Sequence, residues 1–232
     1  MAKSMNPEDI CPISATHQKF GEAGYFLSMM VENYHEPWPF LYNFNAFLQA
    51  NRSVTFMLQK EIANLGNQGL ADLYKTWQEK LKLHPLMKSM NDLRVKTVHN
   101  DLLRAESTIF IGHFRDRKCK SVFRIDLEMF ISSNELLAVH SDYLVDKYLD
   151  EEHSAVGEQI GVERSWQLAE LEEHDILESC IGAFNIMGEL VVEFHEYLDK
   201  KMEFEPVQIS MEVIRVQLEL DRDPTLIDKW RW

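Results

Sequence analysis

The sequence predicts a mainly α-helical protein: an antiparallel helical bundle with a small β-hairpin insertion and a long C-terminal helix. Three observations support this fold class. Apolar residues recur at helical spacing through most of the first hundred residues. Apolar and polar residues then alternate, as in a strand, between residues 107 and 131. A long apolar stripe returns at helical spacing between Leu177 and Leu198, and the short connections of the first half favour antiparallel packing.

Four helices are expected in the first half of the chain, over residues 20–31, 40–64, 70–83 and 86–105. Pro37 and Pro39 separate the first two helices, because proline removes a backbone donor and fixes φ. The second helix is expected to end at Gly66, since glycine favours the left-handed conformation of a C-cap. Pro85 separates the third helix from the fourth.

Asn51 lies near the middle of the apolar face of the second expected helix. A buried amide that lacks a hydrogen-bond partner costs about 1–3 kcal/mol. Two interpretations stay open from the sequence. Either a neighbouring backbone group satisfies this side chain, or the polar group is kept for a binding site.

The β-hairpin is expected to consist of strands over residues 107–114 and 123–131, because apolar and polar side chains alternate there. The polar segment 115–120 between them has the character of a turn. A hairpin of this kind would interrupt an otherwise helical chain.

The second half is expected to continue with a short helix near residues 141–150, an acidic loop, and the long helix over 177–198. The tail contains a possible final helix. We expect residues 1–105 to form the helical bundle. Residues 106–232 are expected to form the hairpin and an acidic helical extension, packed on the bundle as one domain.

Composition bounds the class of protein. The chain has 232 residues, of which 45% are hydrophobic and 11% aromatic, so a folded core is expected rather than disorder. The three cysteines, at 11, 119 and 180, share no short spacing, which favours a reducing compartment over a disulfide framework or a cysteine-based zinc site. The first residues lack an apolar run, and no apolar stretch approaches the roughly 20 residues of a membrane span. We therefore expect a cytoplasmic protein that does not enter the membrane.

Charge is distributed unevenly along the chain. The net charge is −14, with a balance of +4 over residues 1–124 and −18 over residues 125–232. Overall acidity argues against loose binding to nucleic acid, but the mildly basic first half leaves room for a local anion site. The acidic half is explained either by a solvated helix face or by a segment that mimics RNA.

Arg94 and His99 form the clearest chemical motif, an arginine and a histidine separated by four residues on the fourth expected helix. Arginine stays charged and can hold a phosphate, while histidine titrates near neutral pH and can move a proton. Five positions on an α-helix turn the side chains about 140° apart, so a second copy of the helix would have to complete the site. The alternative is an exposed arginine and a half-buried histidine with no catalytic role.

The first part of the chain resembles the HEPN family (higher eukaryotes and prokaryotes nucleotide-binding domain). The resemblance covers roughly residues 15–104. It is carried by the segments NAFLQANRSVTFMLQKE (45–61), LADLYKTWQEKL (70–81) and DLRVKTVHND (92–101), the last of which contains the Arg-x4–6-His motif of the family. Many members have Asn, Asp or His directly after the arginine, whereas this chain has Val95.

This resemblance implies a homodimer in which two Arg/His pairs face one cleft. Active members are metal-independent endoribonucleases, in which the RNA 2′-hydroxyl attacks the neighbouring phosphate, and many act in toxin–antitoxin or phage-defence systems. It implies that Arg94 contacts the scissile phosphate and that His99 acts as acid or base, with an antitoxin-like protein as a possible partner. Other members are inactive, so the alternative is a non-catalytic dimeric module that binds RNA, a nucleotide or a protein.

Four cations mark the expected hairpin turn as a candidate RNA-binding element: Arg115, Arg117, Lys118 and Lys120. Such side chains position RNA phosphates without reading the base sequence. The alternative is a solvated turn whose charges discourage pairing between strand edges.

No metal site or cofactor is expected. Glu189, Glu193 and Glu196 share one helical segment with His195, but Glu193 and His195 are two residues apart and therefore point in different directions. The phosphate-binding loops of nucleotide enzymes and the nucleophile elbow of hydrolases are absent from the sequence.

Overall fold

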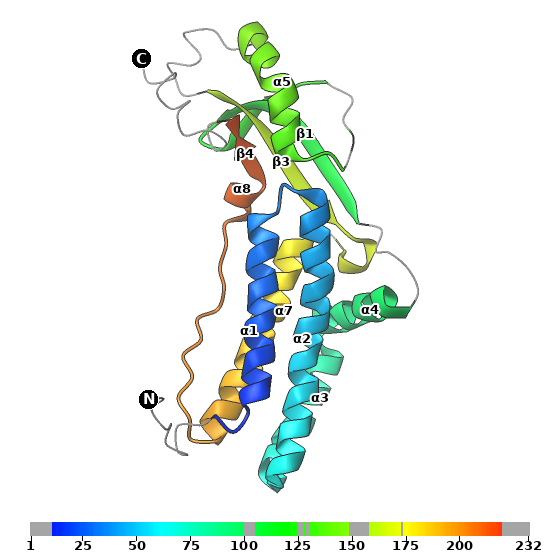
Figure 1. The fold of residues 1–232 in the computed structure, drawn as a ribbon, viewed down its shortest axis with the longest axis vertical. Helices are drawn as coiled ribbons and strands as arrows, with labels where there is room; N and C mark the ends of the chain where they lie inside the picture. Colours follow the sequence, from blue (N-terminus) through cyan, green and yellow to red (C-terminus); the bar gives the residue numbers. More distant parts are fainter. Residues whose placement is uncertain are drawn as a thin grey trace, which may run out of the picture. The chain divides into compact units, whose positions relative to one another are not determined.

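The computed structural model describes residues 11–99, 105–124, 128, 130–148, 158–172 and 174–219. Within these ranges the protein is mainly helical with a small antiparallel sheet, as predicted (Figure 1). The chain divides into two compact units, and each is described by itself. Along the described ranges, each helix is too short or too polar to cross a lipid bilayer.

Unit 1 contains residues 1–28, 43–103 and 177–208, and therefore joins helices from both ends of the chain. Its helices come from five elements: α1 (Ser14–Glu32), α2 (Pro37–Leu65), α3 (Gln68–Leu83), α4 (Pro85–His99) and α7 (Ile176–Tyr197). The division falls inside α1 and α2, so only their parts within these ranges belong to unit 1. The first four of these helices and α7 were all expected, although α1 begins earlier than predicted. α4 is described as far as His99, and the rest of its predicted range, 100–104, lies outside the described residues.

The helices of unit 1 end where local chemistry predicts. Gly66 follows α2 with a φ of 62°, a left-handed conformation that glycine adopts without strain. Asn67 then caps α3, because its side-chain oxygen accepts hydrogen bonds from the backbone N–H groups of Gly69 and Leu70. Pro85 is the first residue of α4, a position at which the missing N–H costs nothing.

Aromatic contacts join α1, α7 and the extended segment after α7. Phe20 of α1 stacks on Phe184 of α7 with ring centroids 4.5 Å apart, and both rings contact Phe204. Gly188 lies directly under the Phe204 ring, where a Cβ atom would approach a ring carbon to 2.2 Å. Figure 1 shows this segment running beside α1.

Unit 2 contains residues 29–42, 104–176 and 209–232. Its centre is a four-stranded antiparallel sheet in the order β2-β1-β3-β4. The strands are β1 (Glu106–Arg115), β2 (Lys118–Val122), β3 (Gln159–Gln167) and β4 (Val216–Leu218). The helical elements of this unit include α5 (Ser133–Tyr148), a 3-10 turn η2 (Ala169–Leu171) and the one-turn α8 (Met211–Ile214).

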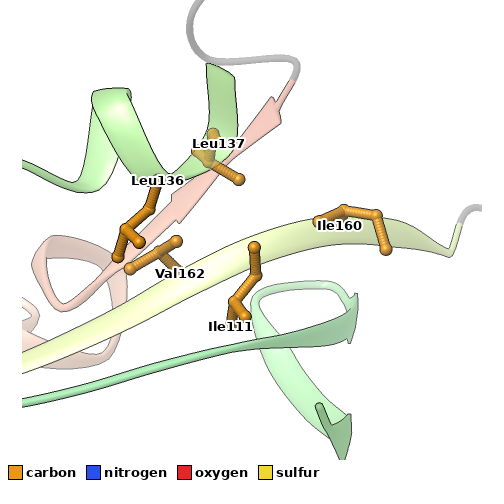
Figure 2. Close-up of a cluster of buried hydrophobic side chains, with 5 residues drawn as sticks. All are labelled: Ile111, Leu136, Leu137, Ile160 and Val162. Atoms are coloured by element: carbon orange, nitrogen blue, oxygen red, sulfur yellow. The ribbon is translucent and has the colours of Figure 1, made fainter. Parts of the chain in front are cut away.

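One apolar cluster holds α5 against the sheet. Leu136 and Leu137 of α5 meet Ile111 of β1 and the two β3 residues Ile160 and Val162, all at most 1% exposed (Figure 2). The inward residues of β3 alternate along the strand, as half-buried strands require. A second buried cluster, formed by Phe114, Val216 and Leu218, covers the opposite face, so both faces of the sheet carry apolar side chains.

The predicted hairpin differs from the observed one in its second strand. The first strand was predicted correctly, but its partner β2 ends at Val122, and the turn is only Asp116–Arg117. Residues 123, 124, 128, 130 and 131 lie outside any strand, and the remainder of the predicted run, 125–127 and 129, lies outside the described residues. Gly112 explains the register, because its missing side chain admits the Ser121 carbonyl of β2.

Two further predictions of the second half were wrong in extent. The helix expected near residues 141–150 begins earlier, at Ser133, and the described part of the tail contains only the short α8 and β4. The strand β3 was not predicted. Its fully buried Arg164 occupies an inward position, which removes the simple apolar alternation that marks a strand. The predicted organisation into residues 1–105 and 106–232 stays a prediction.

Candidate functional site

Arg94 lies on the flank of α4 in unit 1. Leu93, next to it, is fully buried and fixes the inner face of this helix, so Arg94 is half-buried. Its Nε donates to Oε1 of Gln49 on α2 at 3.2 Å, and the Gln49 amide donates to the Thr97 hydroxyl at 3.3 Å. Among the described residues the Arg94 guanidinium has no carboxylate partner. The N–H groups on the two terminal nitrogens of Arg94 are therefore available to a ligand.

A second arginine lies close enough to Arg94 to influence its surroundings. Arg52 of α2 donates to the Thr55 hydroxyl at 2.5 Å, and its guanidinium lies 4.3 Å from the centre of the Phe56 ring. Burial lowers the pKa of Arg52. Tyr74 acts in the opposite direction, and the positive charge of Arg94 has a smaller effect that also lowers the pKa. Two guanidinium groups that repel each other favour an anion between or beside them.

A cavity of a size typical of small-ligand sites opens beside Arg52. Its volume is 660 Å³. Its polar lining comes from α2, α3 and α4: Asn51, Arg52, Thr55, Tyr74, Gln78, Glu79, Lys82, Lys88 and Asn91. Asn91 lies one helical turn before Arg94 on α4. Three lysine or arginine side chains against one glutamate give the lining a positive balance.

Asn51 answers one question that the sequence left open. It is 4% exposed, it lines this cavity, and its Oδ1 has no hydrogen-bond partner. A buried amide oxygen without a partner is destabilising, so the fold alone does not account for it. This observation favours the interpretation that the polar group serves a binding site.

His99 is the last residue of α4, and its side chain lies outside the described part of the chain. Its pairing with Arg94 therefore stays a prediction. The backbone of α4 continues as a regular helix from Arg94 to His99, so the turn of about 140° between the two positions applies.

The four hairpin cations, in unit 2, differ in their surroundings. Arg115 forms an ion pair with Glu158, and Arg117 donates to the Val216 carbonyl at 2.6 Å. Lys118 and Lys120 are exposed. Two of the four predicted RNA-binding side chains thus already hold protein groups, and two face solvent.

The acidic helix α7 uses its carboxylates for contacts within unit 1. Glu193 accepts a hydrogen bond from the Trp77 indole at 2.9 Å, and Glu189 lies 3.7 Å from the Lys80 ammonium. His195 points elsewhere, since its Nε2 lies 3.2 Å from the Cys11 sulfur. Two residues apart on a helix, Glu193 and His195 diverge as the spacing predicted.

Sequence reasoning identified Arg94 but missed Arg52 and the cavity. Arg52 and Arg94 are 42 positions apart, and only the packing of α2 against α4 brings them into range of each other. The one signal in the sequence was Asn51, the polar residue on an apolar face next to Arg52.

Comparison with known proteins identifies a family. A family model described as bacteriophage lambda protein ea47 matches residues 4–228. No curated protein and no solved structure matches the chain. The family match spans nearly the whole chain and includes every residue discussed above.

Proposed function

We propose that the chain, which belongs to the bacteriophage lambda protein ea47 family, is a metal-independent endoribonuclease of HEPN type that acts as a homodimer. The observation that carries the proposal is the Arg94 guanidinium, which has no carboxylate partner among the described residues and lies near a second arginine, Arg52. Such a pair is stabilised by a phosphate group, because an anion offsets the repulsion and accepts the free donors.

Arg94 would hold the scissile phosphate and offset the charge that develops on it. The RNA 2′-hydroxyl then attacks the neighbouring phosphorus, and the bond to the 5′-oxygen breaks. His99 would take the proton of the 2′-hydroxyl or supply the proton of the leaving oxygen. The products are a 2′,3′-cyclic phosphate and a 5′-hydroxyl, and no metal takes part in the reaction.

A homodimer accounts for the angle between the two side chains. Arg94 of one copy and His99 of the other can face one phosphate, although the two positions of one helix point about 140° apart. Val95 and Val98, 38% and 48% exposed, lie on α4 between these residues. A second copy of α4 would cover them, which gives exposed valines on this helix a physical reason.

The cavity beside Arg52 would hold the nucleotide next to the cleaved bond. Lys82 and Lys88 offer charge for phosphate oxygens. The Asn51 oxygen is buried without a partner, and a small rotation of this amide would turn it toward a base amino group in the cavity. Binding by these side chains would be local, which agrees with the expectation that an acidic chain does not bind nucleic acid loosely.

The direct test is cleavage of a mixture of single-stranded and structured RNA in the presence of EDTA, with far-UV circular dichroism to show that the protein stays folded. We expect cleavage by the native chain and its loss in Arg94→Ala and His99→Ala. The matched controls are Arg124→Ala and His174→Ala, two exposed positions in unit 2. Both control variants should cleave at the native rate.

Three results would contradict the proposed ribonuclease or its mechanism. Cleavage that is unchanged in Arg94→Ala and His99→Ala would contradict the proposal, because the activity would belong to another site or to a contaminant. Cleavage that depends on added Mg²⁺ would contradict the metal-independent mechanism. Products that carry a 3′-hydroxyl would exclude attack by the 2′-hydroxyl.

The second candidate is a non-catalytic dimeric module that binds RNA or a nucleotide at the same cavity. Gln49 favours it, since its hydrogen bonds to Arg94 and Thr97 hold the arginine in place for binding rather than for chemistry. This module predicts RNA binding that Arg94→Ala weakens, without cleavage. An antitoxin-like protein partner is compatible with either candidate, and cleavage that appears only after such a partner is removed would identify the enzyme.

A further inference from the structure

Three side chains with metal-binding atoms converge at one end of unit 1. They are Cys11 before α1, His17 in the first turns of α1, and His195 in the last turn of α7. One ligand atom from each lies within 4.8 Å of the others, and the Cys11 sulfur is 3.2 Å from Nε2 of His195. A tetrahedral zinc ion would put one sulfur and two nitrogen ligands about 3.4–3.6 Å apart. The observed spacing therefore needs only small side-chain movements to hold an ion.

His195 is already oriented as a metal ligand. It is 3% exposed, and its Nδ1 lies 2.8 Å from the Val191 carbonyl, one turn earlier on α7. A carbonyl only accepts, so Nδ1 carries the proton and Nε2 presents its lone pair toward Cys11. A backbone carbonyl on the second ring nitrogen is the arrangement that fixes histidine ligands in metal sites.

The segment that carries the other two ligands is held in place by Glu61 of α2. One carboxylate oxygen accepts from the Ala15 N–H at 2.8 Å, and the other accepts from the Thr16 N–H at 2.9 Å and the Thr16 hydroxyl at 2.6 Å. His17 follows directly. This support limits the motion of the first turn of α1, so the ligands are ordered before an ion arrives.

A cavity of 490 Å³ beside the three side chains leaves room for a fourth ligand. It is also lined by Lys200, Lys201, Met202 and Glu203. The lysines favour an anionic fourth ligand, which the Glu203 carboxylate or a hydroxide would supply. One thiolate, two imidazoles and one oxygen form a donor set that suits zinc, a borderline-soft cation with tetrahedral preference.

We propose that Cys11, His17 and His195 bind a Zn²⁺ ion that joins the start of α1 to the end of α7. Binding replaces the thiol proton of Cys11, which is released to solvent, and forms a sulfur–zinc bond and two nitrogen–zinc bonds. The ion stabilises unit 1 and is separate from the chemistry proposed for Arg94 and His99. The two proposals fail independently, because one is read from metal spectra and the other from RNA products.

The test uses the full chain, freed of metal with EDTA under a thiol-free reductant and then titrated with Co²⁺ and Zn²⁺. We expect one Co²⁺ per chain, a sulfur-to-cobalt charge-transfer band, and visible bands of tetrahedral intensity that Zn²⁺ abolishes. Zn²⁺ should also raise the melting temperature. Cys11→Ser should remove the charge-transfer band, and His17→Ala should weaken Zn²⁺ binding by roughly a hundredfold or more.

The matched controls are Cys119→Ser, a half-buried thiol of unit 2, and His174→Ala, an exposed histidine. Both should bind Co²⁺ as the native chain does. His17 is exposed, so His17→Ala should fold even if Cys11→Ser does not. A missing charge-transfer band in the native chain, or a band that survives in Cys11→Ser, would overturn the proposal and leave Cys11 and His195 as a thiol–imidazole hydrogen bond.

Discussion

Arginine side chains have opposite environments in two regions of the molecule. In unit 2, Arg164 is fully buried and its guanidinium donors are taken up by protein acceptors. In unit 1, Arg52 and Arg94 are half-buried neighbours, and only a few of their donors have partners among the described residues. The comparison separates an arginine that serves the fold from arginines that are available to a ligand.

Arg164 lies inside a network of neutral acceptors. Its guanidinium donates to the hydroxyls of Ser133 and Ser107, at 3.3 and 2.7 Å, and to the Ile131 carbonyl. Burial lowers the pKa of Arg164 to about 10, although the charge of Glu36 acts in the opposite direction. The buried cation is tolerated because each of its three guanidinium nitrogens donates to an acceptor, and the Trp166 ring centre lies 5.3 Å from its central carbon.

The nearby carboxylate of Asp175 also has several protein partners. Oδ2 of Asp175 accepts from the Tyr34 hydroxyl at 2.5 Å and from the Trp166 N–H at 3.0 Å, and lies 3.6 Å from Nε of Arg215. The Trp166 indole donates to the Tyr34 carbonyl at 2.9 Å. The network joins the connection between α1 and α2 to β3 and to the segment before α7 through polar groups that are bound to one another.

The largest expected effect on stability comes from removing the buried Arg164 side chain. Arg164→Ala strands two hydroxyls and a carbonyl in the core, so the free energy of unfolding should fall by about 3–5 kcal/mol. Arg94→Ala strands only a half-buried amide and should change it by less than about 1 kcal/mol. Urea unfolding measures both variants. Equal losses of stability in the two variants would contradict the view that Arg164 serves the fold and Arg94 does not.

A smaller effect is expected from giving Arg94 a carboxylate partner. Gln49→Glu puts a carboxylate next to Arg94 Nε, and the resulting ion pair should lower RNA affinity about tenfold while stability changes by less than about 1 kcal/mol. Filter binding or fluorescence anisotropy with RNA measures the affinity. Gln59→Glu, an exposed position on the same helix, is the control and should keep at least half of the native affinity. Equal weakening by both would assign the effect to net charge alone.

Tyr34→Phe should lower stability by about 1–2 kcal/mol, because Asp175 loses its shortest hydrogen bond. Burial, and then the charge of Asp175, raise the pKa of Tyr34 far above its ordinary value. An unfolded tyrosine loses its proton near pH 10 while the folded one keeps it, so native stability should fall as the pH rises above about 10. Urea unfolding between pH 8 and 11 should show a shallower decline in the variant, and an identical decline would contradict this role of Tyr34.

The smallest expected effect concerns Asn51. Asn51→Leu replaces a buried amide with an unpartnered oxygen by an apolar side chain of similar size, so stability should rise by about 1 kcal/mol. Nucleotide or RNA binding should weaken at the same time, which would show that the polar group was kept for a ligand. A variant that is both less stable and binds normally would return Asn51 to a structural role.

The helices of unit 1 were the most predictable part of the fold. Each of α1, α2, α3 and α7 buries apolar side chains at helical spacing. Gly66 after α2, Asn67 before α3 and Pro85 at the start of α4 mark helix ends, and these signals are local. The sheet was less predictable. The alternation after Val122 resembles a strand, yet the true partners of β1 are β2 on one side and β3 on the other, and β3 lies about fifty residues later in the chain.

The sequence by itself determined the class of fold, the positions of the main helices and Arg94 as a candidate site residue, because helical periodicity, capping and residue chemistry are written within a few neighbouring positions. Only the tertiary structure decided which residues meet. Arg52 comes near Arg94, the Asn51 oxygen stays without a partner, and Cys11 meets His195 across 184 positions. These encounters depend on how helices pack, and packing is decided by the whole core rather than by any local stretch of sequence.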